Sequence, residues 1–316
     1  MIIILGGSGY VGSAFCRFFE ERGIEYRNIS RRDCDYTRSD CLEDLIEQVK
    51  PSVLINAAGY TGKPNVDACE VHKTECLDGN AVLPGMIQEV CSRLSLPWGH
   101  VSSGCIFTGR HATGEGFSEY DVPNFSFREN NCSFYSGCKV LGEEAMGFGE
   151  HVHDGKKVWS YLREGRELQA YVWRLRIPFN EVNTPRNYLS KIMKYPRLLD
   201  AENSISQLEE FVEACWQCWE KRVPYGVYNV TNPGVVTAKE IVQLITEERN
   251  RRTSDSEKEW FPDSFDFFED EDEFMRTAAK TPRSNCVLQT DRLESVGIKL
   301  REVNEAVELA LRNWKP

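Results

Sequence analysis

A tyrosine and a lysine four residues apart, Tyr135 and Lys139, are the side chains in this sequence whose spacing best suits acid–base chemistry. On a helix this spacing places both side chains on one face, where they can meet a common ligand. An unperturbed phenol titrates near pH ~10, and an adjacent ammonium favours its ionised form. The pair can therefore exchange a proton with a bound carbonyl or hydroxyl group.

A second chemically capable stretch precedes this pair at residues 101–107. Its apolar run ends in small polar residues, among them Ser103, and carries one reactive thiol, Cys105. We predict the end of a buried strand that delivers side chains into a cleft. Because side chains alternate along a strand, Ser103 and Cys105 are expected on the same face.

The elements that must position these residues follow from hydrophobic periodicity. Strands are predicted at residues 2–5, 25–29, 53–55, 98–107 and 172–175, with helical periodicity between them. We therefore predict an α/β fold, a Rossmann-type doubly wound parallel sheet with a smaller C-terminal substrate-binding domain.

The alternation of strands and helices becomes less regular beyond residue 178, and this change sets the predicted domain boundary. We assign residues 1–178 to a nucleotide-binding domain, to which residues 200–230 return, and residues 179–316 mainly to the substrate-binding domain. Acids alternate with phenylalanines in the segment 263–274, which reads either as an exposed loop or as a flap over a ligand.

A glycine-rich turn follows the first predicted strand and opens an amphipathic helix. Glycines at this spacing allow a tight turn, let backbone N–H groups approach a pyrophosphate, and pack the helix against the strand. The helix N-terminus adds partial positive charge. The alternative is a tight βα turn without a ligand. The candidate cofactor-binding residues of this turn are Gly6, Ser8, Gly9, Tyr10, Val11 and Gly12.

The end of the second predicted strand bears on which nicotinamide cofactor is bound. Arg31 and Arg32 favour a 2′-phosphate and hence NADPH, whereas Asp33 or Asp35 keeps NADH open. The alternative is a solvated basic turn. The third strand ends in small residues that leave room for a flat cofactor, namely Ala57, Ala58 and Gly59.

Composition excludes several other classes of protein. The formal net charge of -11 over 316 residues argues against a nucleic-acid surface. No stretch approaches the roughly 18 consecutive apolar residues of a membrane span, and no basic segment precedes the short apolar N-terminus. We expect a soluble, cytoplasmic protein without a membrane partner.

Cysteine and histidine patterns do not predict a disulfide framework or a metal site. The 12 cysteines are scattered, which suggests reduced thiols. Cys215 and Cys218 share an apolar helical stripe and are expected to be buried. The cluster of His151, His153 and Asp154 lacks further ligands, so we interpret it as part of a surface insertion at residues 147–168.

The glycine turn and the Tyr-x-x-x-Lys spacing together resemble the extended short-chain dehydrogenase/reductase family. The resemblance implies that Tyr135 donates or accepts a proton at a carbonyl or hydroxyl oxygen. It implies that Lys139 lowers the pKa of this tyrosine and holds the nicotinamide ribose, and that Ser103 hydrogen-bonds the same oxygen. Asn80 matches an asparagine that supports this site in the family.

A closer resemblance covers nearly the whole chain and points to nucleotide-rhamnose epimerase-reductases, relatives of dTDP-4-dehydrorhamnose reductase. It implies a UDP- or dTDP-4-keto-6-deoxy-hexose substrate, epimerised at C3 and C5 and then reduced at C4. The motifs that carry the resemblance include Asn56-Ala57-Ala58-Gly59, Pro64-Asn65-Val66-Asp67, Gly104-Cys105-Ile106-Phe107, Pro185-Arg186-Asn187 and Pro282-Arg283-Ser284-Asn285.

This resemblance assigns the epimerising groups to Cys105 and Lys191. Protons next to the C4 ketone are acidic because their removal leaves an enolate. GDP-fucose synthase, which epimerises and reduces, also has a cysteine two residues after its catalytic serine. A thiol near pH ~8.5 and a desolvated amine would suit the pair. The alternatives are an inert buried cysteine and a lysine on a solvated helix.

The substrate is expected to bind through groups that recognise phosphates or sugar hydroxyls. Reduction without epimerisation is one alternative function. Another is a non-catalytic, cofactor-binding regulatory subunit, against which the intact Ser103, Tyr135 and Lys139 argue. The oligomeric state stays open, with a homodimer as one option. The candidate substrate-binding residues are Thr61, Lys63, Asn65, Arg186, Asn187 and Arg283.

Overall fold

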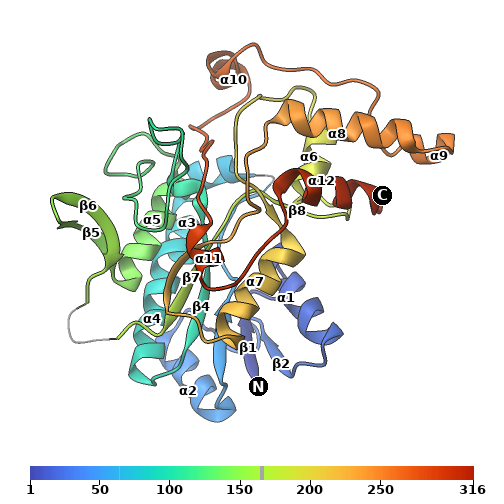
Figure 1. Ribbon diagram of the computed structural model, residues 1–316. Coiled ribbons are helices and arrows are strands. Elements are labelled where there is room, and N and C mark those ends of the chain that lie inside the picture. Colours follow the sequence, from blue (N-terminus) through green and yellow to red (C-terminus); the bar gives the residue numbers. More distant parts are fainter. Residues whose placement is uncertain (64, 164–166) are drawn as a thin grey trace.

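A six-stranded parallel sheet forms the centre of the computed structural model, which describes residues 1–63, 65–163 and 167–316 (Figure 1). The strand order β10-β7-β4-β3-β1-β2 runs in opposite directions on the two sides of β1. This is the doubly wound, Rossmann-type arrangement, so the predicted fold class is confirmed. The strands are β1 (Ile2–Leu5), β2 (Tyr26–Ile29), β3 (Val53–Asn56), β4 (Trp98–Ser103), β7 (Ala170–Leu175) and β10 (Gly226–Asn229).

Helices cover both faces of the sheet, which is why the central strands are apolar throughout rather than alternating. In β1, Ile2 and Ile4 belong to one core cluster, and Ile3 and Leu5 belong to the other. The first face is covered by α1 (Tyr10–Glu21) and α7 (Leu208–Glu220), which contact each other. The opposite face is covered by α2 (Ser39–Val49), α4 (Leu83–Arg93) and α5 (Phe134–Met146).

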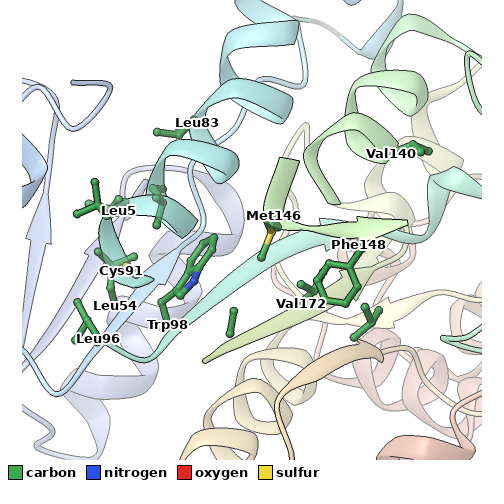
Figure 2. Close-up of a cluster of buried hydrophobic side chains, with 14 of the residues drawn as sticks. Leu5, Leu54, Leu83, Cys91, Leu96, Trp98, Val140, Met146, Phe148 and Val172 are labelled. Carbon is green, nitrogen blue, oxygen red and sulfur yellow. The ribbon is translucent and has the colours of Figure 1, made fainter. Parts of the chain in front are cut away.

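The core beneath α4 and α5 fixes the helix that carries Tyr135 and Lys139. Figure 2 shows Met146 of α5 between Trp98 of β4 and Val172 of β7, with Leu5 and Leu54 of β1 and β3 in the same cluster beside Cys91. Burial of each such side chain contributes roughly 1.5–3 kcal/mol to stability. The register of α5 against β4 is therefore set by this core.

The segment between β3 and β4 consists of short helical pieces rather than one helix. These are η1 (Val66–Glu70), α3 (Lys73–Leu77) and a π-helical turn, η2 (Asp78–Val82), which leads into α4. Turns of π-helix are rare and are found mostly where a helix must present a particular side chain. Asn80 lies in this turn and is fully buried.

The second lobe has its own apolar core, which includes Phe179, Leu189, Ile245 and Val307. Its short strands β8 (Pro178–Phe179) and β9 (Ser206–Gln207) pair in parallel. The chain returns to the sheet through α7 and β10, and Cys215 and Cys218 of α7 are fully buried, as predicted. The helices of this part are α6 (Tyr188–Lys194), α8 (Ala238–Arg251), α9 (Asp255–Lys258), α10 (Glu271–Thr277), α11 (Asp291–Ser295) and α12 (Val303–Arg312).

The insertion after α5 forms an antiparallel hairpin of β5 (Phe148–His153) and β6 (Lys156–Tyr161), beside the sheet (Figure 1). Asp154 is at the exposed hairpin turn with φ 50°, and His151 and His153 precede it. Within the described ranges, no group of three or more His, Cys, Asp or Glu side chains is placed to hold a metal ion. In those same ranges, no helix is long and apolar enough to cross a membrane.

Candidate active site

The glycine turn between β1 and α1 is too tight for side chains. Gly6 has φ +81°, and a Cβ atom at Gly12 would lie 2.1 Å from the carbonyl oxygen of Gly6. Gly9 is the N-cap of α1 and provides no side-chain cap, so the first N–H groups of the helix are available to an anion. Ser8 is exposed beside them. This cradle fits a pyrophosphate.

The Tyr10 side chain points away from this cradle. Its hydroxyl donates a hydrogen bond to Asn180 Oδ1 at 3.2 Å, which joins α1 to the second lobe. The Tyr10 hydroxyl is therefore engaged by the second lobe. Burial raises the pKa of Tyr10, and Glu209 adds to the effect.

At the end of β2 the turn presents two exposed arginines, Arg31 and Arg32. Neither takes part in an ion pair within the described part of the chain. Asp33 is hydrogen-bonded within the turn. Its Oδ2 accepts from the Ser30 hydroxyl at 2.6 Å, and this bond lowers the pKa of Asp33. Asp35 accepts from Thr37 Oγ1 at 2.5 Å, which likewise lowers its pKa.

The loop after β3 comes into contact with both the glycine turn and α5. A Cβ atom at Gly6 would lie 2.5 Å from Ala58 N, so the first and third strand ends are packed together. A Cβ atom at Gly59 would lie 3.0 Å from Asn80 Oδ1 and 3.8 Å from Lys139 Nζ. Residues 57–59 therefore join the cofactor cradle to the Lys139 ammonium.

Asn80 hydrogen-bonds the backbone of the loop after β3 at Tyr60. Its Nδ2 donates to the carbonyl of Tyr60 at 2.7 Å, and its Oδ1 accepts from Tyr60 N at 3.3 Å. Nδ2 also donates to the Cys76 carbonyl at 3.0 Å. Asn80 is thus a buried brace for the residues beside Lys139 rather than a group open to a ligand.

The stretch at residues 101–107 is shorter as a strand than predicted. β4 ends at Ser103, and Gly104–Ile106 form the 3-10 turn η3. Ser103 Oγ accepts from Cys105 N at 3.2 Å and caps the turn. The predicted strand alternation is therefore wrong beyond Ser103, because the side-chain cap competes with continued strand pairing. Cys105 nevertheless lies buried beside Ser103, with 6% of its surface exposed.

Tyr135 and Lys139 lie on one face of α5, and Lys139 Nζ is 5.9 Å from the centre of the Tyr135 ring. Lys139 is buried and donates to the carbonyl of Val101 at 3.4 Å. Burial lowers the pKa of Lys139. Ser133 is the N-cap of α5 and accepts from Ser136 N at 3.2 Å, which fixes where the helix begins.

The pKa of Tyr135 moves opposite to the direction expected from the sequence. Burial raises it well above the ordinary value, and Cys105 adds to this effect. The Ser103 hydroxyl beside the phenol acts in the lowering direction but is outweighed. The phenol is therefore a neutral proton donor in the free protein.

Three buried cysteines behind Tyr135 were not anticipated as a group. Cys69, Cys76 and Cys138 are fully buried in one cluster against which Tyr135 packs. The neighbouring thiols and the Asn80 amide lower the pKa of Cys76, and the Lys139 ammonium acts in the same direction. In the sequence, the one indication of this cluster is the position of Cys138, three residues after Tyr135 on the same helix.

Lys191 lies in α6 of the second lobe and is partly buried. Burial lowers its pKa, and the Arg186 guanidinium lowers it further. None of the ion pairs among the described residues includes Lys191. A lysine of this kind has more neutral amine at a given pH and is suited to proton exchange.

Arg186 and Arg283 both reach from the second lobe to the loop at residues 61–70. Arg186 donates to Thr61 Oγ1 at 3.0 Å and to the Gly62 carbonyl at 2.8 Å. Arg283 pairs with Asp67 through two contacts of 2.7 and 2.8 Å. In this structure their guanidinium groups hold protein groups instead of lying free for a phosphate.

Two predicted substrate-binding asparagines stabilise the backbone. Asn187 is fully buried: its Oδ1 accepts from Leu189 N at 3.0 Å and its Nδ2 donates to the Asn180 carbonyl at 2.7 Å. Asn65 caps η1 by accepting from Asp67 N at 2.9 Å. Lys63 is exposed, and Pro64 of the same motif lies outside the described residues.

The acidic and aromatic segment is held against the second lobe. Arg197 pairs with Glu273 at 2.6 Å, donates to the Phe267 carbonyl at 3.0 Å and stacks over the Phe268 ring at 4.4 Å. Leu198, four residues after the end of α6, forms a parallel bridge with Phe267 of this segment. The segment is thus docked next to the helix that carries Lys191.

Comparison with known proteins places these features in context. Residues 1–156 match the RmlD substrate binding domain family. The chain is 31% identical over 310 residues to the bifunctional dTDP-4-dehydrorhamnose 3,5-epimerase/dTDP-4-dehydrorhamnose reductase of Arabidopsis thaliana, a match that covers 96% of this chain and 90% of the relative.

A longer relative from Arabidopsis thaliana is the trifunctional UDP-glucose 4,6-dehydratase/UDP-4-keto-6-deoxy-D-glucose 3,5-epimerase/UDP-4-keto-L-rhamnose-reductase. It is 34% identical over 247 residues, which cover 77% of this chain and 33% of the relative. The chain therefore matches about a third of that protein's length.

Solved structures agree in fold. The UDP-rhamnose synthase from Acanthamoeba polyphaga mimivirus has a TM-score of 0.81 at 21% identity and covers 99% of this chain and 98% of its own. The dTDP-4-dehydrorhamnose reductase from Bacillus anthracis, solved in complex with NADP, has a TM-score of 0.72 at 15% identity, with 98% and 96% covered.

Proposed function

Because the chain belongs to the RmlD family together with the bifunctional 3,5-epimerase/reductases, we propose that it is an NADPH-dependent reductase of a nucleotide-linked 4-keto-6-deoxy hexose that also epimerises C3 and C5. The family resemblance predicted from the motifs is confirmed. The product is a nucleotide-linked sugar of the L-rhamnose type.

One arrangement carries the proposal: the turn at Ser103 and Cys105 faces Tyr135 and Lys139 across the strand end. The Ser103 hydroxyl lies beside the Tyr135 phenol, and Lys139 Nζ lies beside Gly59. A hydroxyl, a phenol and a thiol therefore lie close together next to the cofactor loops, the groups that a ketone with acidic neighbouring C–H groups requires.

The residues around the glycine turn fit a dinucleotide. A Cβ atom at Gly12 would fill the cradle, and the uncapped start of α1 supplies N–H donors for a pyrophosphate. Arg31 and Arg32, exposed at the end of β2, suit a 2′-phosphate. When bound, NADPH supplies the hydride for the carbonyl carbon.

In reduction, Tyr135 donates its proton to the ketone oxygen, and Ser103 hydrogen-bonds that same oxygen. The raised pKa of Tyr135 keeps the proton on the phenol until the oxygen gains negative charge. Lys139 holds the ribose side of the site through its position beside Gly59.

In epimerisation, Cys105 and Lys191 exchange protons with the carbons beside the ketone from opposite faces, each acting as a base in its deprotonated form and as an acid in its protonated form. The C–H electron pair moves onto the ketone oxygen as an enolate, which Ser103 and Tyr135 stabilise by hydrogen bonds. Return of a proton to the opposite face inverts each carbon. The lowered pKa of Lys191 supports its part in this exchange.

The second lobe, mainly residues 179–316, holds the nucleotide sugar in this proposal. Arg186 and Arg283 exchange their contacts at Thr61 and Asp67 for substrate phosphates. Lys63 is exposed at the same loop and adds positive charge. A cytoplasmic homodimer completes the proposal.

The proposal is tested with UDP- or dTDP-4-keto-6-deoxyglucose and NADPH. We expect NADPH oxidation, followed at its absorbance, and a rhamnose-type product by chromatography. Tyr135→Phe should lower the reduction rate by at least about a hundredfold, since general acid catalysis contributes roughly 10²–10⁴. Tyr120→Phe is the matched control, because Tyr120 is 52% exposed. Full activity of Tyr135→Phe would contradict the assigned role.

Reduction without epimerisation is the second candidate, favoured by the burial of Cys105, which raises the pKa of its thiol. A regulatory subunit without catalysis is a third. It predicts that NADPH binds but is not oxidised by either nucleotide sugar.

A further inference from the structure

A buried arginine beside the turn that carries Cys105 forms no ion pair with any described residue. Arg176 follows β7 and is 6% exposed. Its guanidinium donates to Asn203 Oδ1 at 2.5 Å and to the carbonyl of Ser284, both uncharged, and its Nε has no partner. Across the described ranges, none of the ion pairs includes Arg176.

Arg174, two residues earlier, is a buried arginine that does have an ion-pair partner. It is fully buried and pairs with the equally buried Glu143 at 2.7 Å. A buried charge without such a partner is costly, and neutral acceptors offset only part of that cost. The charge on Arg176 is therefore uncompensated unless an anion forms next to it.

Arg176 packs on the turn that carries Cys105. Its Cδ atom is 3.5 Å from the position that a Cβ would take at Gly104, between Ser103 and Cys105. Asn203 Oδ1, which accepts from Arg176, also accepts from Cys286 N at 3.2 Å, and the Cys286 thiol donates to the Gly104 carbonyl at 3.3 Å. The guanidinium is thus linked to the turn through Asn203 and Cys286.

Cys105 is the thiol on the turn against which Arg176 packs, and an adjacent positive charge favours its anionic form. Tyr135 and Tyr188 stay neutral, because burial raises the pKa of Tyr135 and brings that of Tyr188 to about 12. Burial raises the pKa of Cys105, and Arg176 and Lys139 oppose this. The titratable or charged groups around Cys105 are Cys69, Glu70, Cys132, Tyr135, Lys139, Arg176 and Cys286.

We propose that Arg176 is a positioning residue whose buried guanidinium serves as the counter-charge of the Cys105 thiolate during epimerisation. This assignment rests on the proposed function. The Cys105 thiolate takes a proton from a carbon beside the ketone and becomes a neutral thiol, while the C–H electron pair moves into the enolate. The negative charge stays within the field of Arg176 throughout the step.

The test is the pH dependence of Cys105 alkylation by iodoacetamide, read by mass spectrometry of the Cys105 peptide. Arg176→Met should shift the midpoint upward by about one pH unit, and lower the rate below the midpoint about tenfold, because a nearby opposite charge is lost. Arg176→Lys keeps the charge and should stay close to the wild-type midpoint. Arg110→Met, which removes a surface partner of Glu202, should leave it unchanged.

A second variant neutralises the charge without removing the arginine. Asn203→Asp places a carboxylate against the guanidinium at the existing 2.5 Å contact, and should shift the midpoint upward like Arg176→Met. If Arg176→Met does not fold, Asn203→Asp decides the question. Unshifted midpoints in both folded variants, or a downward shift, overturn the assignment.

Failure of the proposed function is distinguishable from failure of this assignment. If proton exchange at C3 and C5 persists in Cys105→Ser while the thiol midpoint still shifts in Arg176→Met, Cys105 is not the epimerising group. Arg176 then remains the counter-charge of its thiolate.

Discussion

At the scale of single residues, the proposed function gives the site two tasks that share one ketone. Tyr135 holds a proton because burial raises its pKa, and Lys191 releases one more readily because burial lowers its pKa. The same physical effect therefore favours the neutral form of both groups. Reduction requires a neutral acid, and epimerisation requires a neutral base.

The pH dependence of epimerisation gives a prediction for Lys191. Arg186 lowers the pKa of Lys191, so Arg186→Met should raise this pKa and leave less neutral amine at a given pH. The acidic limb of the exchange rate at C3 and C5 should then move to higher pH.

Solvent-deuterium exchange measured by NMR against pH checks this prediction. Arg186→Lys keeps a positive charge and should keep the wild-type profile. A limb that stays in place or moves to lower pH in Arg186→Met would exclude an electrostatic effect of Arg186 on Lys191.

Residue spacing predicted part of this site and missed the rest. Tyr135 and Lys139 share a face of α5, as the four-residue spacing indicates, and Ser103 lies on the predicted strand, which ends there instead of at residue 107. The turn at Cys105 was missed because it depends on a side-chain cap, and Arg176 because its lack of a carboxylate partner is a tertiary property.

At the scale of elements, α5 carries the site and is anchored by buried polar contacts as well as by the apolar core. Glu143 of this helix accepts from Arg174, from Ser102 Oγ at 2.8 Å and from Trp159 Nε1 at 3.1 Å. These contacts join α5 to β4, to β7 and to the hairpin strand β6. The lysine one turn earlier, Lys139, is thereby held in place.

This network predicts a large loss of stability when one partner is removed. Glu143→Gln leaves the Arg174 charge buried without a partner and should lower the free energy of unfolding by about 3–5 kcal/mol. Urea denaturation followed by circular dichroism measures this loss.

The double variant Glu143→Leu, Arg174→Met provides the control for this network. It removes both charges and should cost less than the single substitution. A loss below about 1 kcal/mol in Glu143→Gln would show that the pair does not anchor α5, because a typical exposed ion pair contributes no more than that.

The order of elements was predictable because apolar runs and helical stripes alternate along the first half of the chain. The short strands β8 and β9 carry too few residues for periodicity, and the β5–β6 hairpin pairs only with itself. Their positions are set by contacts between distant segments, which a local pattern does not contain.

At the scale of the whole molecule, the two lobes are tied together across the loop at residues 61–70. Arg186 and Arg283 of the second lobe hold Thr61, Gly62 and Asp67. These contacts hold Thr61, Gly62 and Asp67 against the second lobe.

Removing one tie should loosen the loop without unfolding the protein. Arg283→Ala should raise amide hydrogen exchange in peptides spanning residues 61–70, while the thermal midpoint changes little. Arg301→Ala, which breaks an ion pair with Glu210 elsewhere, is the matched control and should leave exchange in these peptides unchanged. Unaltered exchange in Arg283→Ala would mean that the ion pair with Asp67 does not hold the loop.

The central claim is that one site both epimerises and reduces, and solvent-deuterium exchange tests it most directly. The enzyme is incubated with UDP-4-keto-6-deoxyglucose in deuterated water without cofactor, and C3 and C5 are followed by NMR and mass spectrometry. We predict deuterium at both carbons with wild type and with Tyr120→Phe, and a loss of at least about a hundredfold with Cys105→Ser. Absence of deuterium at both carbons with the wild-type enzyme would contradict the account and leave reduction alone.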